Sequence, residues 1–338
     1  MPRDATRDVV RGLTSLEMTF VNISTLRWTL HSGYIGQITY ADTIFPCFAF
    51  LSGMSPAPAR RNVGLIGIGL SLQTVSAVVN RKPVVRIPGV LQRLGVASLI
   101  VNEPRLAFLR RYHGVPLMLL WYAITLLGAS KTSIENPLAH PDYPAADARG
   151  IAQTRIDRMF FGQGLYTPSY DPEGLLGSLT TAVSMLVGHS FKEQSFTASQ
   201  KIMASITMIT VGETLHFLLP KYAPISKSLW TPSFVLVTSG VSVLKYLALE
   251  RAMPYLPTTI QNLLLAVGKR SLEVYVISTL LTMLFTLGGQ QSFMARGMRL
   301  IGSVTGAAAA DFIMSLGFTG IVAASAKFMV SRNLRLRW

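Results

Sequence analysis

His31 and Asp42 are the two residues whose types and spacing most directly indicate chemistry. His31 stands in a short polar link between two apolar segments, and Asp42 follows a few residues inside the second segment. An ionisable side chain is costly inside a membrane span and is therefore a candidate for function by default. A neutral imidazole can act as a base or a nucleophile, and a carboxylate can orient it. The alternative is an interfacial histidine near a capped or paired carboxylate.

A second polar cluster falls in the run RIPGVLQRLGV, over residues 86–96. The Pro-Gly pair in this run fits the opening of a helix, which places Gln92 and Arg93 in its first two turns. A guanidinium there binds a phosphate or a carboxylate, or else it extends to the lipid head groups. The same two interpretations apply to Arg86.

Acidic residues also precede a predicted helix in the run YDPEGLLGS, which closes a long polar link over residues 131–172. Asp171 can cap this helix and Glu173 suits the positive end of its dipole. Capping is the main role predicted for them, and lining a site is the alternative. Glu213 and His216 lie three positions apart, on one face of another predicted helix, where they form either a self-satisfied pair or part of a binding site.

The composition is that of a membrane protein. Half of the 338 residues are hydrophobic and only 14% are charged, whereas a soluble domain carries roughly 25% charged residues; the mean hydropathy is +0.41. Apolar runs of about 20 residues predict an all-α, polytopic integral membrane protein, a single transmembrane domain over residues 1–338 with about ten transmembrane helices. The runs lie near residues 8–30, 38–56, 62–80, 87–103, 113–130, 173–190, 199–219, 230–249, 258–287 and 302–330.

The net charge of +15 does not indicate nucleic-acid binding. The lysines and arginines are scattered through the interhelical links, where positive charge orients a membrane protein. Their distribution predicts cytosolic termini and a non-cytosolic 131–172 link.

Cys47 is the single cysteine, and no Cys/His cluster has zinc spacing, so neither an internal disulfide nor a metal is expected. Glu17 falls inside the first predicted span and must find a donor there; Asp311 lies midway along the last predicted span, with no role assigned.

The residues around His31 form a longer pattern, which is made by His31, Tyr34, Gly36, Thr39, Asp42, Phe45, Pro46, Phe48, Phe50 and Gly53. This pattern resembles a motif of the heparan-α-glucosaminide N-acetyltransferase family, with Tyr34 in the place of a tryptophan. The runs RIPGVLQRLGV, YDPEGLLGS and KSLWTPSF resemble the same family. So does GKRSLEVY, although Arg270 stands there where an asparagine is expected.

The resemblance implies an acyltransferase that uses acetyl-CoA as co-substrate, lies in an endomembrane and has His31 as its catalytic residue. Asn22 matches an asparagine that helps form the site, where a donor can stabilise an oxyanion. Arg93, Arg86 and Gln92 are the candidates for binding the cofactor. The candidates for binding the substrate are Tyr34, Asp171, Glu173, Trp230, Glu213 and His216.

The parity of the predicted spans places these separate motifs on one side of the membrane. We therefore predict a multi-pass acyltransferase that moves an acetyl group from acetyl-CoA to an amine or hydroxyl of a small-molecule or glycan acceptor; a homodimer is left open. Two other classes stay open. One is a membrane-embedded cyclase or isomerase, similar to terpene cyclases, in which buried acids protonate a lipophilic substrate. The other is a small-molecule transporter with charges along its path.

Overall fold

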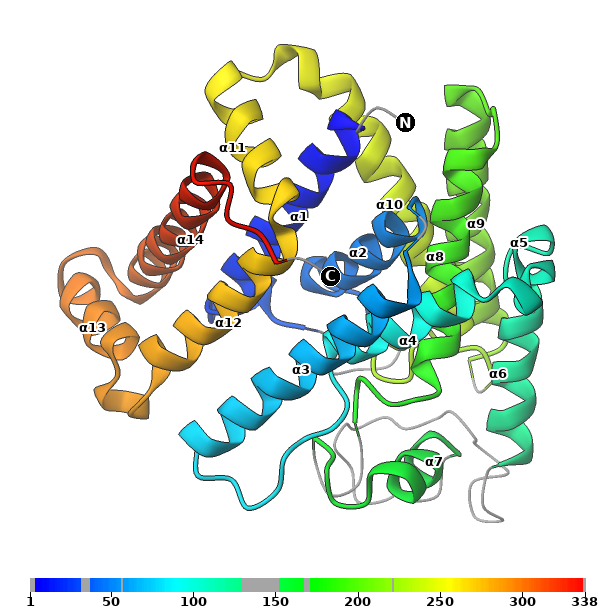
Figure 1. Ribbon diagram of the computed structural model, residues 1–338, viewed down its shortest axis with the longest axis horizontal. Helices are drawn as coiled ribbons and strands as arrows, with labels where there is room; N and C mark the ends of the chain where they lie inside the picture. The colour runs from blue at the N-terminus through cyan, green and yellow to red at the C-terminus, as the bar shows by residue number, and fades with distance from the viewer. Residues whose placement is uncertain are drawn as a thin grey trace.

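The computed structural model describes residues 4–31, 37–55, 57–128, 152–166, 171–220 and 222–336, and these ranges fold into α-helices joined by short 3-10 helices, with no strand among them (Figure 1). The all-α prediction is confirmed. The α-helices are α1 (Ala5–Val21), α2 (Ile44–Gly53), α3 (Ala59–Val79), α4 (Val90–Asn102), α5 (Phe108–Arg111), α6 (Val115–Leu127), α7 (Ala152–Phe161), α8 (Gly177–Glu193), α9 (Ala198–Leu218), α10 (Pro232–Ala252), α11 (Thr258–Lys269), α12 (Ser271–Thr286), α13 (Phe293–Thr305) and α14 (Ala307–Ser331).

In the described ranges, three helical stretches are long and apolar enough to cross a membrane. They are α3, the stretch Pro232–Tyr255 that contains α10, and α14. Helices α4, α6 and α12 are apolar but shorter. This content is that of an integral membrane protein, although the ten predicted spans are not all present as separate long helices.

Two predicted spans are divided by breaks in the backbone. The run 258–287 forms α11 and α12, which meet at Arg270. The run 302–330 forms the end of α13 and the whole of α14, which are separated by Gly306 with a φ of 86°. Since this left-handed conformation suits glycine and cannot continue a right-handed helix, the chain reverses here and α13 packs back against α14.

Local signals explain where the helices beside the site begin. Thr231 accepts a hydrogen bond from the backbone N–H of Phe234, and Pro232 follows it in the first turn of α10, where its missing N–H costs nothing. The 3-10 helix η2 (Tyr40–Thr43) has a capping box in which Thr39 and Asp42 bond each other's backbone N–H, which satisfies donors that helix starts leave unpaired.

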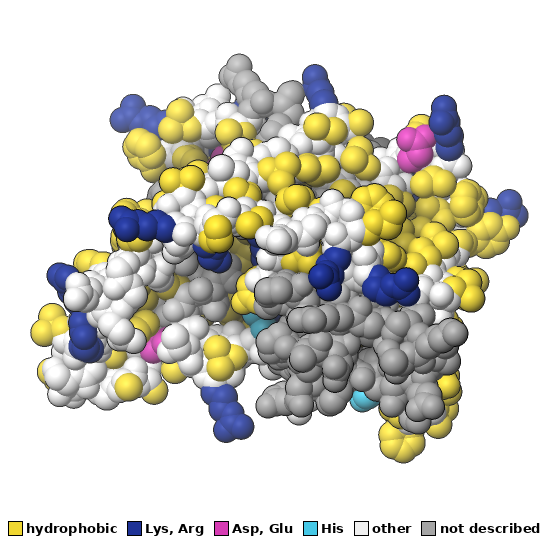
Figure 2. Space-filling model, turned by 90° about the horizontal axis from the view of Figure 1, so that it is seen from below, with side chains coloured by type: hydrophobic (Ala, Val, Ile, Leu, Met, Phe, Trp, Pro, Cys, Tyr) yellow, Lys and Arg dark blue, Asp and Glu magenta, His cyan; other side chains and the backbone are white. Residues whose placement is uncertain are grey.

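Close crossings then fix these helices against one another. Helices α2 and α8 approach so closely that a Cβ at Gly53 would overlap the carbonyl oxygen of Met185, and a Cβ at Gly188 would overlap that of Phe50. The crossing thereby fixes α2 against α8. Figure 2 shows the molecule from below the view of Figure 1, where Lys and Arg side chains stand between hydrophobic side chains.

The predicted 131–172 link is only partly described. It includes one helix, α7, which packs at the end of α6 through a hydrogen bond of 3.0 Å from Gln153 Nε2 to Thr125 Oγ1. Tyr170 and the remainder of the link between residues 129 and 151 lie outside the described residues.

Candidate functional site

His31 and Asp42 contact each other directly. The imidazole Nδ1 lies 3.0 Å from Asp42 Oδ1, while Asp42 Oδ2 accepts the backbone N–H of Thr39 at 2.9 Å and its hydroxyl at 3.0 Å. The Asp42 side chain is fully buried, whereas the His31 side chain is 48% exposed. In the tautomer that donates from Nδ1, the ring keeps a lone pair on Nε2. The arrangement therefore gives an oriented imidazole that substrate can reach.

Lys227 completes this cluster, and sequence reasoning missed it. Its ammonium lies 3.1 Å from the same Oδ1 of Asp42. Burial lowers the pKa of Lys227, although the Asp42 carboxylate acts in the opposite direction. The signal was present in the sequence, because Lys227 is the first residue of the KSLWTPSF run.

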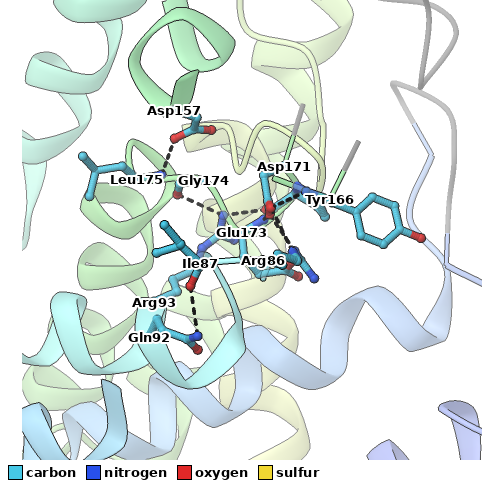
Figure 3. Close-up of polar contacts among 11 residues, drawn as sticks. Arg86, Ile87, Gln92, Arg93, Asp157, Tyr166, Asp171, Glu173, Gly174 and Leu175 are labelled. Atoms are coloured by element: carbon cyan, nitrogen blue, oxygen red, sulfur yellow. Dashed lines mark hydrogen bonds and ion pairs between the residues drawn. The ribbon is translucent and has the colours of Figure 1, made fainter. Parts of the chain in front are cut away.

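A second cluster joins Arg86 to Asp171 and Glu173 (Figure 3). Arg86 donates to both oxygens of Asp171, from Nε at 2.8 Å and from Nη2 at 2.6 Å, and also pairs with Glu173. The buried Asp171 carboxylate further accepts the backbone N–H of Tyr166 and of Glu173. Burial acts against both charges, yet the pKa of Glu173 is lowered by the nearby guanidiniums and the pKa of Arg86 is raised by the two carboxylates.

The predicted capping role of Asp171 is wrong. Helix α8 begins at Gly177 and its N-cap residue is Leu176, with no side-chain cap. Residues 171–174 instead form a turn in which Gly174 N–H bonds the carbonyl of Asp171. Because the helix starts a turn later than predicted, the Asp171 side chain is left to bind Arg86.

Arg93 and Gln92 donate hydrogen bonds to backbone carbonyls near this turn. Arg93 Nη2 donates to Pro172 O at 2.5 Å and Gly174 O at 3.3 Å, and Gln92 Nε2 donates to Ile87 O at 3.0 Å. A Cβ at Gly177 would press against the Arg93 guanidinium, so that glycine provides the room for the arginine.

Trp230 links the two clusters. The Arg93 guanidinium lies 4.8 Å from the centre of its ring, and the ring of Phe45 stands edge-on to it at 5.1 Å. Phe45 is at the start of α2, three residues after Asp42, and Trp230 follows Lys227 by the same spacing. The fully buried indole of Trp230 thus packs between Phe45, which is close to Asp42 in the chain, and Arg93.

Asp157 is a third buried carboxyl group here, and the sequence analysis did not single it out. Its Oδ1 accepts the backbone N–H of Leu175 at 2.7 Å. Burial raises the pKa of Asp157 to about 7, and the charge of Asp171 adds to this, whereas the Leu175 hydrogen bond and Arg93 oppose it.

Other predicted site residues lie apart from this buried network. Asn22 is the exposed C-cap residue of α1. Glu213 is exposed on α9, and His216 Nδ1 accepts the backbone N–H of Ile225 at 3.4 Å. Tyr34 lies outside the described residues.

A cavity of about 390 Å³ lies at the far ends of α2, α4 and α8, away from His31. Each of these helices begins beside the site and ends at the cavity. Polar lining residues include Ser52, Ser98, Asn102, Arg110, His189 and Glu193.

Comparison with known proteins adds a distant relation. No family model matches the chain. The heparan-alpha-glucosaminide N-acetyltransferase of Homo sapiens is 26% identical over 364 residues, which cover 81% of this chain and 54% of that protein. The Mus musculus protein of the same name is 26% identical over 359 residues, which cover 79% and 53%. The relation is distant. The chain spans about half the length of these relatives. At a coarse level, their names are consistent with a transferase.

Proposed function

We propose that this chain is a membrane acyltransferase that moves an acetyl group from acetyl-CoA to an amine or hydroxyl acceptor. The observation that carries the proposal is the contact of 3.0 Å between His31 Nδ1 and the buried Asp42 carboxylate. This contact leaves Nε2 to take a proton. The distant relation to N-acetyltransferases supports the same chemistry.

In the base form of the mechanism, His31 Nε2 takes a proton from the acceptor as its nitrogen or oxygen attacks the thioester carbonyl. The new bond to carbon forms, the carbon–sulfur bond breaks, and the thiolate leaves and receives a proton. Asp42 stabilises the imidazolium that forms in between. In the nucleophile form, Nε2 attacks the carbonyl itself, the carbon–sulfur bond breaks, and the thiolate leaves and receives a proton. In a second step the acceptor attacks the acetyl carbon, loses its proton, and the bond from that carbon to Nε2 breaks to restore the imidazole.

Arg86, Arg93 and Gln92 are poorly suited to hold the phosphates of the donor. Arg86 is committed to two carboxylates, and the other two bind backbone carbonyls. A phosphate would have to displace these contacts. We assign the donor phosphates instead to the cavity at the far ends of α2, α4 and α8, which Arg110 and His189 line as basic groups. Arg110 also donates to the carbonyl of Val101, but it borders a cavity that a phosphate can enter.

The cyclase alternative has less support. A cyclase of that kind needs a protonated acid, whereas the Asp42 carboxylate is paired with the Lys227 ammonium and receives donors from His31 and Thr39. Such partners favour the charged form. Glu17 is ion-paired as well, with Lys245 of α10.

The test uses the purified chain in lipid nanodiscs. Acetyl-CoA should raise the thermal midpoint, because a ligand that binds the folded state stabilises it, and CoA should be released when amines or alcohols are added. The variants Arg110→Gln and Arg86→Gln separate the two candidate phosphate sites, since only the first should abolish the acetyl-CoA shift. A folded preparation with neither a shift nor CoA release would refute the proposal.

A further inference from the structure

A row of aromatic side chains lies on the surface beside His31. Phe20, at the end of α1, stacks on Trp28 with ring centres 5.7 Å apart. Phe312 of α14 stands edge-on to Phe20 at 5.7 Å, and Tyr40 of η2 lies 6.5 Å from Trp28. Trp28, Tyr40 and Phe312 are each about half exposed. The order Phe312, Phe20, Trp28, Tyr40 forms one surface, here called the aromatic row.

The row is held in place by a buried carboxylate. Asp311, which directly precedes Phe312, accepts hydrogen bonds from Ser24 Oγ at 2.7 Å and from the backbone N–H of Thr25 at 2.8 Å. It also accepts the Thr25 hydroxyl. Because Thr25 and Trp28 belong to the same short link, this anchor fixes the Trp28 ring against the rings of α1 and α14.

One end of the row faces the bilayer. Phe312 belongs to α14, a helix long and apolar enough to cross a membrane. Ile313 and Leu316 are also exposed on that helix, and exposed apolar side chains on a membrane-spanning helix contact lipid. The row therefore continues a lipid-facing surface.

The other end of the row is polar and adjoins the catalytic pair. The Tyr40 side chain lies close to the carboxylate of Glu17, which is ion-paired with Lys245. Tyr40 and Asp42 share the single turn of η2, and Asp42 binds His31. Apolar surface thus passes into polar, charged groups over the length of the row, which is the pattern that matches an amphiphile.

We propose that the acceptor is an amphiphilic amine or alcohol that reaches His31 from the bilayer, with its alkyl portion on the aromatic row and its head group at the imidazole. The acetyl transfer rests on the proposed function, whereas the binding of the amphiphile does not. Because aromatic rings also stack on the C–H faces of sugars, the probes used below differ only in the length of their alkyl chain.

Fluorescence quenching tests the binding without any turnover. The chain has four tryptophans, of which Trp121 and Trp230 are fully buried. The signal of Trp28 is therefore obtained as the difference between the wild type and Trp28→Phe in nanodiscs. The probes are 11-bromoundecylamine and 3-bromopropylamine, which share a head group and differ in chain length. The long probe, at low mole fraction in the lipid, should quench Trp28 saturably and be displaced by undecylamine, whereas the short probe should not quench.

Two phenylalanine variants of α14 provide the control. Phe312→Ala should raise the concentration of undecylamine needed for displacement by about two- to tenfold. This factor corresponds to the usual free energy of an aromatic contact. Phe328→Ala removes an exposed ring near the other end of the same helix and should change nothing. Quenching that undecylamine does not displace, or that a brominated phospholipid equals at the same mole fraction, would show an interfacial aromatic anchor only and would overturn the proposal. If quenching behaves as expected and no acetylated amine forms, the proposed function is at fault and the binding site stands.

Discussion

His31 and Lys227 contact the same atom, Oδ1 of Asp42, at 3.0 and 3.1 Å. The two residues are far apart in the sequence: His31 lies in the link before α2 and Lys227 in the link before α10. The second oxygen of Asp42 is taken by Thr39. Asp42 therefore has two tasks, to orient the imidazole and to balance a partly buried ammonium, and its substitution affects both.

The first prediction concerns His31. Replacing it with alanine should reduce turnover at least about 10²–10⁴-fold, the usual contribution of a general base, and should leave the thermal midpoint nearly unchanged because the side chain is half exposed. The control is His113→Asn, at an exposed histidine with a φ of 48°, a conformation that asparagine tolerates. Full activity in His31→Ala would remove the catalytic assignment. Labelling of the protein by radioactive acetyl-CoA without acceptor would indicate the nucleophile.

The second prediction concerns Lys227. Lys227→Met should lower the thermal midpoint, because the buried Asp42 carboxylate loses its ammonium partner. The double variant with Asp42→Asn should lose less stability than the two single losses together, since the pair interacts directly. Lys269→Met, at an exposed lysine, is the matched control. Additive losses, measured by thermal unfolding of the wild type, the two single variants and the double variant, would show that the contact carries no coupling.

The third prediction concerns Arg86. Arg86→Met should cost about 3–5 kcal/mol of unfolding free energy, because it leaves the Asp171 carboxylate buried without a cation. Adding Asp171→Asn should recover part of that loss, and denaturant unfolding of the two variants measures it. A change of less than about 1 kcal/mol, the range of surface ion pairs, would mean that the bidentate contact contributes little.

The fourth prediction is the pH dependence set by Asp157. Its pKa is raised from 3.8 to about 7, so between these values the folded state holds a proton that the unfolded state has released. Raising the pH through this window should therefore lower the free energy of unfolding, by at most about 1.4 kcal/mol per pH unit. Asp157→Asn cannot ionise, and its thermal midpoint should lose this part of the slope between pH 4 and 7. An unchanged slope would contradict the role of Asp157.

Much of the fold and part of the candidate site follow from the sequence alone. The apolar runs predict helices, and the pairing of His31 with Asp42 is predictable because the two residues are only 11 positions apart in the chain. Span parity brings the 86–96 run and the YDPEG run to one side. These are relations that local patterns and chain direction determine.

The remaining features depend on packing that a pattern does not contain. The contact between Lys227 and Asp42 arises only when α2 and α10 are placed together. The exposed position of Asn22 follows from α1 ending at Val21, before the polar link. Asp157 gave no signal, since its raised pKa comes from burial and from the charge of Asp171, and burial of a carboxyl group in a polar link is not visible in composition.

Asp311 carries the last prediction, because it anchors the link that ends at His31. Its carboxylate accepts Ser24 Oγ and the backbone N–H of Thr25, and Ser24 Oγ in turn accepts the backbone N–H of Leu26 and the Thr29 hydroxyl. Asp311→Ala removes the acceptor for the Thr25 N–H, so hydrogen exchange over residues 22–31 should become faster. Turnover should fall as the His31 link loosens, while exchange in α9, which is remote from α14, stays the same.

The matched control for Asp311→Ala is Ser315→Ala. It removes only the longest of the bonds to Asp311, at 3.3 Å, and should leave exchange over residues 22–31 and turnover close to wild type. Each neutral hydrogen bond contributes about 0.5–1.5 kcal/mol and those to a charged group about 1.5–3 kcal/mol, so Asp311→Ala should also lower the thermal midpoint clearly more than the control does. A lower midpoint with unchanged exchange over residues 22–31 would mean that Asp311 stabilises α14 and does not position His31.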